Sequence, residues 1–155
     1  MQIAPIEQQD LALALALVER VFLQFEAPDY TPEGIATFRA FLHDPEAVAA
    51  LTFYGATVEE QLVGILATRG SSHIALFFVE PCFQRQGIGR ALFLAAKKVC
   101  NTDVMTVNSS PYAVEIYRRL GFLPISSEQM KDGIRFTPMK CVFDAENRYC
   151  LKNEC

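Results

Sequence analysis

Hydrophobic and polar positions in the first part of the chain follow a helical pattern after a short predicted strand at residues 2–6. Residues 7–26 are dominated by Leu, Ala, Gln and Glu and contain neither Gly nor Pro, which predicts a long, mostly buried helix that ends before Pro28. The Thr-Pro-Glu run at 31–33 has the order of N-cap, first helical position and first-turn acid. A second helix is therefore expected from there to about Leu42.

The middle of the chain has the pattern of β-strands. An Asp-Pro pair at 44–45 is expected to end the second helix, and residues 48–57 and 61–69 form two β-like runs joined by a tight connection at 58–60. These runs predict an antiparallel hairpin. Residues 73–79, with the sequence HIALFFV, are almost continuously apolar and are bounded by turn residues. Such a run is typical of a central strand that is covered on both faces.

A strand, helix, strand unit begins with this apolar strand. A loop with two glycines leads into a predicted helix at residues 91–100 and a predicted strand at 104–108, and such units have a right-handed crossover. A Ser-Pro pair at 110–111 then begins a further helix, which runs to Leu120. Gly121 is expected to end that helix in the left-handed conformation.

The C-terminal part is expected to complete the sheet. Two strands, residues 123–129 and 134–143, flank a Lys-Asp-Gly turn at 131–133. Residues 144–155 are polar and are expected to form a loosely held tail. Because no internal repeat or domain boundary interrupts the pattern, one domain over residues 1–155 is predicted.

Composition and charge narrow the classes of function. The chain has 155 residues, of which 51% are hydrophobic and 21% charged, and a chain of this size buries a real core. Its formal net charge of -4 offers no broad basic surface, so we expect no nucleic-acid partner. The longest apolar run, residues 11–18, is far shorter than the roughly 20 residues that cross a bilayer. We therefore expect no membrane partner and, since no signal-like segment precedes this run, a cytoplasmic location.

The cysteines and histidines give no metal site. Five cysteines are spread along the chain without a CxxC pair, and they are accompanied by only two histidines, which favours reduced thiols. A zinc site needs clustered ligands at short spacings, which Cys150 and Cys155 alone do not supply. No metal is therefore predicted. The oligomeric state, with a homodimer as one option, is left open.

The loop before the helix at 91–100 has the features of a phosphate-binding loop. It reads Gln84-Arg85-Gln86-Gly87-Ile88-Gly89-Arg90. Its glycines let the main chain approach a ligand closely, and the N–H groups that open the next helix carry the positive end of the helix dipole. The loop does not match a P-loop, because Gly89 is followed by Arg-Ala rather than Lys-Ser/Thr. It does not match a dinucleotide fingerprint either, because Leu92 stands where the third glycine is required.

Two motifs carry a resemblance to a known family. The pattern Gln84-x-x-Gly87-x-Gly89 resembles the pyrophosphate loop of the GNAT superfamily of N-acetyltransferases. Residues 113–122 resemble the segment Ala-x-x-x-Tyr-x-x-x-Gly-Phe that closes the coenzyme A site in that superfamily. The order of the predicted elements is also similar to that of the GNAT fold. The resemblance implies an α/β fold with a mixed, mostly antiparallel sheet of six to seven strands, about four flanking helices, and a splayed pair of parallel strands that holds coenzyme A.

The same resemblance implies an activity and a coenzyme site. The activity is transfer of an acetyl group from acetyl-coenzyme A to a primary amine of a small molecule or peptide. The backbone N–H near Val79 would face the thioester carbonyl. Many family members have an asparagine seven residues before the tyrosine, where this chain has Ser110, with Asn108 two residues earlier. Ser110 is interpreted as a helix N-cap or a ligand, and Asn108 as a contact for the pantetheine arm. The remaining coenzyme-binding candidates are Gln84, Arg85, Gln86, Gly87, Ile88, Gly89 and Arg90.

Tyr117 is the predicted general acid, because a phenol with a reference pKa near 10 stays protonated at neutral pH and can protonate the leaving thiolate. The alternative is a core aromatic residue. Glu80 is the first candidate for the base, since it follows the apolar strand, and its alternative is a solvated carboxylate. His73 is the second candidate for the base.

The acceptor is expected against the link between the first two helices, residues 25–30. Glu26 and Asp29 lie there among aromatic residues, which suits a cationic amine, and the alternative is an ordinary acidic loop. Arg135 faces either the cleft or solvent, because alternation along a strand gives no absolute direction. The alternative functions are a non-catalytic module or sensor that binds acyl-coenzyme A and, more distantly, a dinucleotide-dependent enzyme.

Overall fold

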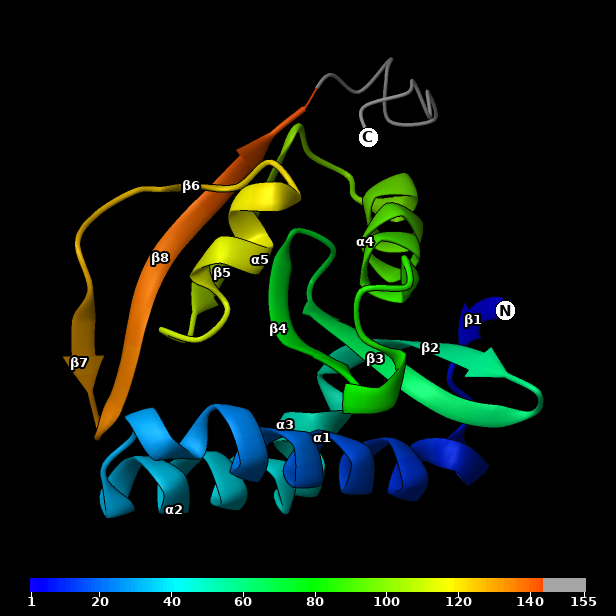
Figure 1. Ribbon diagram of the computed structural model, residues 1–155, viewed down its shortest axis with the longest axis horizontal. Coiled ribbons are helices and arrows are strands. Elements are labelled where there is room, and N and C mark those ends of the chain that lie inside the picture. Colours follow the sequence, from blue (N-terminus) through cyan, green and yellow to red (C-terminus); the bar gives the residue numbers. More distant parts are fainter. Residues whose placement is uncertain (144–155) are drawn as a thin grey trace.

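The computed structural model describes residues 1–143, so the tail predicted at 144–155 lies outside the described residues. Within residues 1–143, eight strands form one open sheet in the order β1-β2-β3-β4-β5-β8-β6, and β7 also pairs with β8 (Figure 1). The strands are β1 Gln2–Pro5, β2 Leu51–Val58, β3 Gln61–Arg69, β4 His73–Val79, β5 Val104–Ser109, β6 Leu123–Pro124, β7 Gln129–Lys131 and β8 Ile134–Val142. All pairs are antiparallel except β4 with β5. The predicted mixed, mostly antiparallel α/β fold is confirmed.

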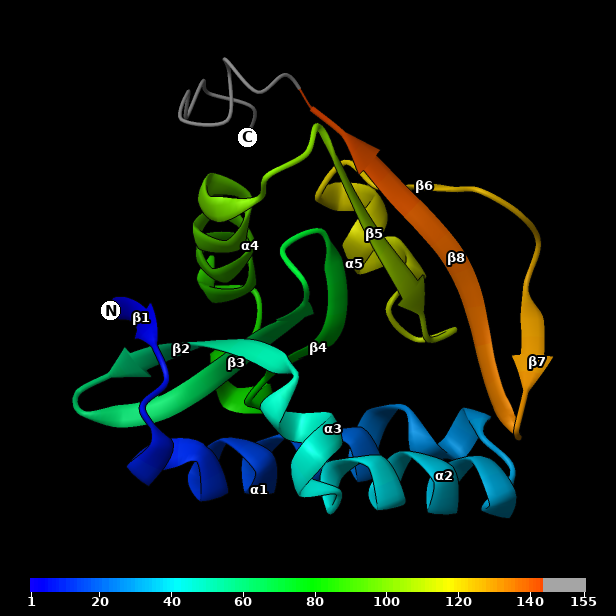
Figure 2. The same cartoon turned by 180° about the vertical axis from the view of Figure 1, so that it is seen from behind.

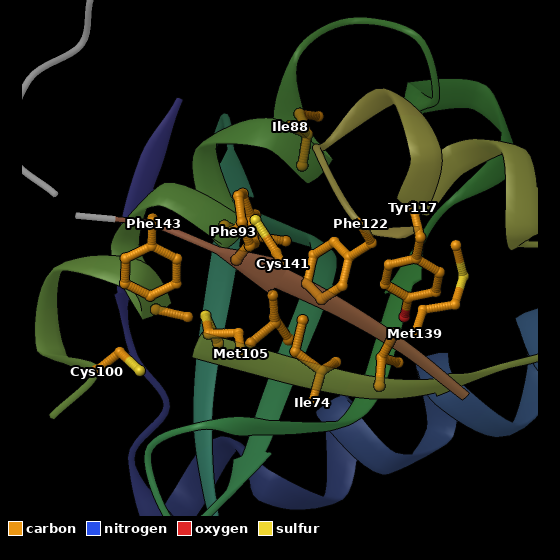
Figure 3. Close-up of a cluster of buried hydrophobic side chains, with 14 of the residues drawn as sticks. Ile74, Ile88, Phe93, Cys100, Met105, Tyr117, Phe122, Met139, Cys141 and Phe143 are labelled. Atoms are coloured by element: carbon orange, nitrogen blue, oxygen red, sulfur yellow. The ribbon is translucent and has the colours of Figure 1, made fainter. Parts of the chain in front are cut away.

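Helices cover both faces of this sheet. The helices are α1 Leu11–Phe25, α2 Pro32–Leu42, α3 Pro45–Ala49, α4 Ile88–Val99 and α5 Val114–Arg119, with short 3-10 turns at Gln8–Asp10, Ala27–Asp29 and Pro81–Phe83. A hydrophobic cluster under α1 and α2 includes Val18, Phe22 and Phe78. A second cluster, under α4 and α5, includes Phe93 and Phe122, and Figure 3 shows its side chains filling the space beside β8.

The structure corrects the start of the first predicted hairpin strand. The Asp-Pro pair follows the end of α2, as expected, and it also begins the short helix α3. The Asp44 carboxylate accepts hydrogen bonds from the backbone N–H groups of Glu46 and Ala47 at 3.1 and 3.4 Å, and Pro45 occupies the first helical position. This is the N-cap arrangement that favours a helix. The strand predicted from residue 48 therefore begins at Leu51.

Other boundaries also differ from the prediction, and the helix expected from the Ser-Pro pair at 110–111 begins at Val114. The helix expected at residues 91–100 begins at Ile88, because Gly87 is its N-cap with a positive φ of 84°. The strand expected at 123–129 consists of two short strands, β6 and β7, which contact different parts of β8. Gly121, with a φ of 104°, has the left-handed conformation that was expected after α5.

β4 and β5 pair over two positions only and then diverge. His73 pairs with Thr106 and Ile74 with Val107, and no further pair joins these strands within the described residues. The divergence begins at a β-bulge, since Ala67 and Thr68 of β3 oppose Leu76 and Ile74, which leaves Ala75 as the extra residue of β4. A bulge bends its strand and increases the local twist. The two strands therefore separate toward their carboxyl ends, as Figures 1 and 2 show.

The N-terminus of α2 contacts the turn between β7 and β8. The Thr31 N–H donates to the Gly133 carbonyl at 3.3 Å, and a Cβ built on Gly34 would lie 2.2 Å from the same oxygen. Gly133 itself has a φ of 79°, which glycine adopts without strain. Glycine at both positions therefore permits a close approach of two backbones, which joins the helical layer to the far end of β8 (Figure 2).

Candidate active site

Two cavities lie at the divergence of β4 and β5. The first, of about 440 Å³, extends from the loop before α4 to α5 and the end of α1. The second, of about 310 Å³, extends along β4 toward β3, α2 and β8. Five residues line both cavities, so the two spaces meet at one place in the fold. These residues are Glu26, Phe77, Phe78, Ala113 and Tyr117.

The first cavity is bordered by the N-terminus of α4. Gly87 lies in the left-handed conformation and Ala91 N–H donates to its carbonyl at 3.0 Å, so helical hydrogen bonding begins there. The first N–H groups of a helix have no partner within it and carry partial positive charge. A Cβ on Gly87 would meet no protein atom within 4 Å, whereas one on Gly89 would lie 3.5 Å from the ring of Phe77. The loop therefore presents bare backbone to the cavity.

Aromatic and amide side chains connect this loop to α1. The Gln84 amide donates to the Val79 carbonyl at 3.0 Å, which fixes the loop to the end of β4. The Tyr112 hydroxyl is 3.5 Å from the Gln84 amide oxygen, and its ring stacks on Phe25 with 5.1 Å between centroids. These contacts bring three segments that are far apart in the sequence to the edge of one cavity.

The predicted coenzyme residues do not all lie in the same place. Of the predicted coenzyme residues, those that line the first cavity are Val79, Gln84, Arg85, Gly87, Gly89 and Arg90. Gln86 is exposed and donates to the Cys82 carbonyl, and the Ile88 side chain is buried in the cluster under α4. Asn108 and Ser110 line the second cavity. The Ser110 hydroxyl also accepts from the Ala113 N–H at 3.3 Å, so it caps the turn that leads into α5.

Tyr117 lies at the meeting point of the two cavities. Its ring contacts Phe77 and Phe122 edge to face, with centroids 5.9 and 5.4 Å apart, and Figure 3 shows it beside Phe122 with the hydroxyl directed away from the α5 backbone. Burial, and secondly the negative charge of Glu26, raise the pKa of Tyr117 well above its ordinary value. The phenol is therefore protonated at any physiological pH.

Neither of the two residues predicted as the base lies at the meeting point of the two cavities. Glu80 forms an ion pair with Arg20 of α1, and it is not among the residues that line the two cavities. His73 lies in the second cavity, where its Nδ1 is 2.8 Å from the Thr106 hydroxyl. Burial, and then the charge of Arg69, lower the pKa of His73, so its ring is neutral at pH 7.

Glu26 has a perturbed ionisation that the sequence did not indicate. It is half-buried at the end of α1. Burial raises its pKa from 4.5 to about 7, a hydrogen bond from the Ser110 side chain opposes that rise, and the charge of Asp29 adds to it. The sequence placed Glu26 in an acceptor loop, but the burial comes from segments distant in the chain. Only the fold reveals it.

The Arg135 side chain is partly exposed and reaches the link between the first two helices. It forms ion pairs with Asp29 at 3.8 Å and with Glu128 at 3.2 Å. The link between the first two helices is thereby tied to the hairpin of β7 and β8. Asp29 therefore anchors this link and is not among the residues that line the two cavities, whereas Glu26 lines both.

Residues 1–143 contain no group of three or more His, Cys, Asp or Glu side chains that could hold a metal ion. In the same part of the chain, every helix is too short or too polar to span a membrane.

Solved structures of similar fold are numerous. A GCN5-related N-acetyltransferase from Rhodopseudomonas palustris superposes with a TM-score of 0.79 at 22% identity, over 92% of this chain and 95% of the other. The PaiA N-acetyltransferase from Thermoplasma acidophilum, solved in complex with coenzyme A, gives 0.65 at 17% identity, over 92% and 100%. Tetrahymena GCN5 gives 0.66 at 14% identity, over 94% and 98%. At these identities the likeness concerns the fold. No curated protein sequence matches the chain.

A family model identifies the chain from its sequence. The model described as an acetyltransferase (GNAT) domain matches residues 26–143, which include the loop before α4, the tyrosine of α5 and both diverging strands. The resemblance inferred from the two motifs is thereby confirmed, and the chain belongs to the GNAT family of acetyltransferases.

Proposed function

We propose that this protein transfers an acetyl group from acetyl-coenzyme A to a primary amine of a small molecule or peptide. The observation that carries the proposal is the meeting of two cavities at Tyr117, where β4 and β5 diverge. One cavity has a loop suited to phosphates, and the other has room for a small acceptor. A thioester held across this junction would be accessible from both sides.

The first cavity is suited to coenzyme A. The N-terminus of α4 and the bare backbone at Gly87 and Gly89 provide N–H donors for the pyrophosphate. Arg85 and Arg90 line the same cavity and supply positive charge. The pantetheine arm would follow the gap between the diverging strands toward Asn108 and Ser110. The complex of the similarly folded PaiA protein with coenzyme A supports this proposal.

Tyr117 is suited to the role of general acid. Its phenol lies at the junction, is only 6% exposed, and is kept protonated by burial. When the C–S bond of the thioester breaks, the electron pair stays on sulfur and the Tyr117 hydroxyl can donate a proton to it. The base predicted from the sequence, Glu80, stays a prediction, and its ion pair with Arg20 would have to open for it to act.

The second cavity is proposed as the acceptor site. Glu26 lies where the cavity meets the coenzyme side, whereas Arg69 at the end of β3 pairs with His73 at the beginning of β4. Phe78 lies at the junction with Glu26, and His73 lies at the other end of β4, which rises about 3.3 Å per residue. The negative charge of Glu26 and the positive charge of Arg69 therefore lie toward opposite ends of the cavity. For this reason, acceptors with and without an anionic group should be compared.

The test is a turnover assay with acetyl-coenzyme A that measures free thiol. The acceptor panel contains polyamines, amino acids, aminoglycosides and peptides with free N-termini. Acceptor-dependent thiol release, with an acetylated amine identified by mass spectrometry, is the expected result. Binding of acetyl-coenzyme A without turnover on any acceptor would overturn the proposal in favour of a non-catalytic binding module.

A further inference from the structure

Glu26 is the one acidic side chain, among the described residues, that lines both cavities. We propose that Glu26 is the general base of the acetyl transfer, and that its carboxylate takes the proton from the acceptor nitrogen as the new C–N bond forms. This inference rests on the proposed function and assigns a role for which the sequence pointed to Glu80. Its basis is where the fold holds the carboxylate and what surrounds it.

The end of α1 fixes the position of Glu26. The Glu26 N–H donates to the Phe22 carbonyl at 2.9 Å, so the residue completes the last helical turn. On one side, Phe25 is held by stacking on Tyr112, and on the other, Ala27 is buried in the cluster under α1. The carboxylate therefore points into the divergence of β4 and β5, where the Ser110 hydroxyl contacts it.

The surroundings of Glu26 suit a base that works near neutral pH. Burial raises the pKa of Glu26 to about 7, while the Ser110 hydrogen bond favours the ionised form. A base is most effective when its pKa lies near the working pH. The ionisable groups that face the two cavities around it are Tyr112 before α5, Tyr117 of α5, Tyr30 before α2, Arg69 of β3, His73 of β4, Arg85 and Arg90 beside α4, and Glu115 and Arg119 of α5. Asp29 acts on it from the same link.

The proposed base and acid act on each other. The charge of Glu26 is the second cause, after burial, that raises the pKa of Tyr117. When Glu26 takes the proton from the nitrogen, this negative charge disappears, and Tyr117 becomes a stronger acid at the moment when the thiolate leaves. Tyr117 then gives its proton to sulfur, and the proton on Glu26 returns to the Tyr117 phenolate. For a neutral amine, the cycle yields amide and free thiol with both residues regenerated.

The test compares the pH dependence of four forms of the full chain. Wild type, Glu26→Gln, Glu80→Gln and Glu33→Gln are assayed with one acceptor between about pH 5.5 and 9. The quantity measured is the ratio of wild-type to variant kcat/KM, because the ionisation of the acceptor amine cancels in it. Glu33 is the matched control, since it is an exposed acid in the first turn of α2.

For Glu26→Gln, we expect the ratio to rise about tenfold per pH unit below pH 7 and to level off above it, with kcat lower by about 10²–10⁴. The affinity for acetyl-coenzyme A, measured by calorimetry, should stay within about twofold of wild type, which shows that the variant is folded. The ratio for Glu33→Gln should be near one at every pH.

Two results would overturn the inference alone. One is a wild-type enzyme that turns over while the ratio for Glu26→Gln is independent of pH. The other is the rising ratio appearing in Glu80→Gln instead. A wild-type protein that acetylates no acceptor overturns the proposed function itself, and the inference with it.

Discussion

The two cavities that meet at Tyr117 are built in different ways. Most of the wall of the proposed coenzyme cavity comes from two short stretches of chain, residues 77–90 and 112–120. The wall of the proposed acceptor cavity comes from the link after α1 and from α2, β3, β4, β5, α5 and β8, so it draws on most elements of the described chain. Phosphate binding depends on backbone N–H groups and glycine, which form a local motif. Acceptor binding in the other cavity would depend on side chains that only the complete fold brings together.

The strongest test of the junction between these cavities is Tyr117→Phe. The variant keeps the buried ring and removes only the hydroxyl, so a general acid predicts a loss in kcat of about 10²–10⁴, with little change in affinity for acetyl-coenzyme A. Steady-state kinetics and calorimetry measure the two quantities. A kcat within about twofold of wild type, under conditions where chemistry is rate-limiting, would pass the acid role to water or another group.

Thermal unfolding of the same variant separates the two interpretations of Tyr117. No hydrogen bond from the phenol to another described residue is found, so its removal should change stability little. A large loss would show instead that the hydroxyl has a structural role with a buried partner, because leaving such a partner unpaired costs about 1–3 kcal/mol.

Glu26→Gln should raise the free energy of unfolding above pH 7, although the same variant is expected to lower kcat. The folded pKa, about 7, lies above the ordinary value of 4.5. Between these values the unfolded chain has released the proton that the folded chain still holds, so wild-type stability falls as pH rises through this window. Each unit of raised pKa corresponds to about 1.4 kcal/mol. Since Glu26 is partly exposed, we expect the variant to gain about 1–3 kcal/mol at pH 8 and almost nothing at pH 4.

Denaturant unfolding at these two pH values checks that expectation. Glu33→Gln is again the control, and it should show no pH-dependent gain. An equal effect of Glu26→Gln at both pH values would show that burial does not disfavour the ionised carboxylate.

On the coenzyme side, Gly89→Ala should weaken acetyl-coenzyme A binding by about tenfold or more, which corresponds to at least about 1.4 kcal/mol of binding free energy. The new Cβ would lie 3.5 Å from Phe77, which is an ordinary contact, so the protein tolerates it. The loss would therefore come from crowding of the phosphates. Calorimetry measures it, and unchanged affinity in the folded variant would move the pyrophosphate away from this loop.

Gly87→Ala is the complementary variant. Its Cβ would meet no protein atom within 4 Å, but the φ of 84° strains any residue with a side chain, at a cost of about 1–2 kcal/mol. Gly87→Ala should therefore lower stability as well as affinity, whereas Gly89→Ala lowers affinity alone.

The smallest effect is expected from the charges around the coenzyme cavity. Arg85 is exposed there, so Arg85→Gln should weaken binding by only about two- to fivefold, and added salt should reduce the difference between wild type and variant. Titration with dephospho-coenzyme A tests whether the arginine contacts the 3′-phosphate. If Arg85→Gln has the same effect on both forms of the coenzyme, the contact is with the pyrophosphate or the side chain lies in solvent.

The contrast between the cavities also explains what the sequence could predict. β3 and β4 were predicted at their observed bounds, because turn residues mark the ends of their apolar runs. The loop before α4 was recognised because Gly87 and Gly89 are needed for local geometry. The splayed strands were expected only through the family resemblance. The bulge at Ala75 that accompanies the splay has no signal in the run HIALFFV, where almost every position is apolar.

Glu26 illustrates the limit on the candidate site. Its neighbours in the sequence form an acidic segment among aromatic residues, but its unusual pKa depends on burial and on Ser110, which is far away in the chain. Glu80 shows the opposite case, because it directly follows β4 in the sequence but forms an ion pair with Arg20. Proximity in sequence to a functional motif does not place a side chain in the cavity.

The extra residue of β4 also makes the length of that strand critical. Ala75 and Leu76 both pack toward α1, and after them Phe77 and Phe78 face opposite clusters in regular alternation. Loss of Ala75 would restore an unbroken ladder with β3 without moving the other side chains, because Ile74, Leu76 and Phe77 already alternate between the two clusters. Loss of a residue elsewhere in β4 would make the side chains beyond it change faces. A related chain that lacks the bulge therefore lacks Ala75, because a shift of one position elsewhere in β4 exchanges the residues that pack under α4 for those that pack under α1.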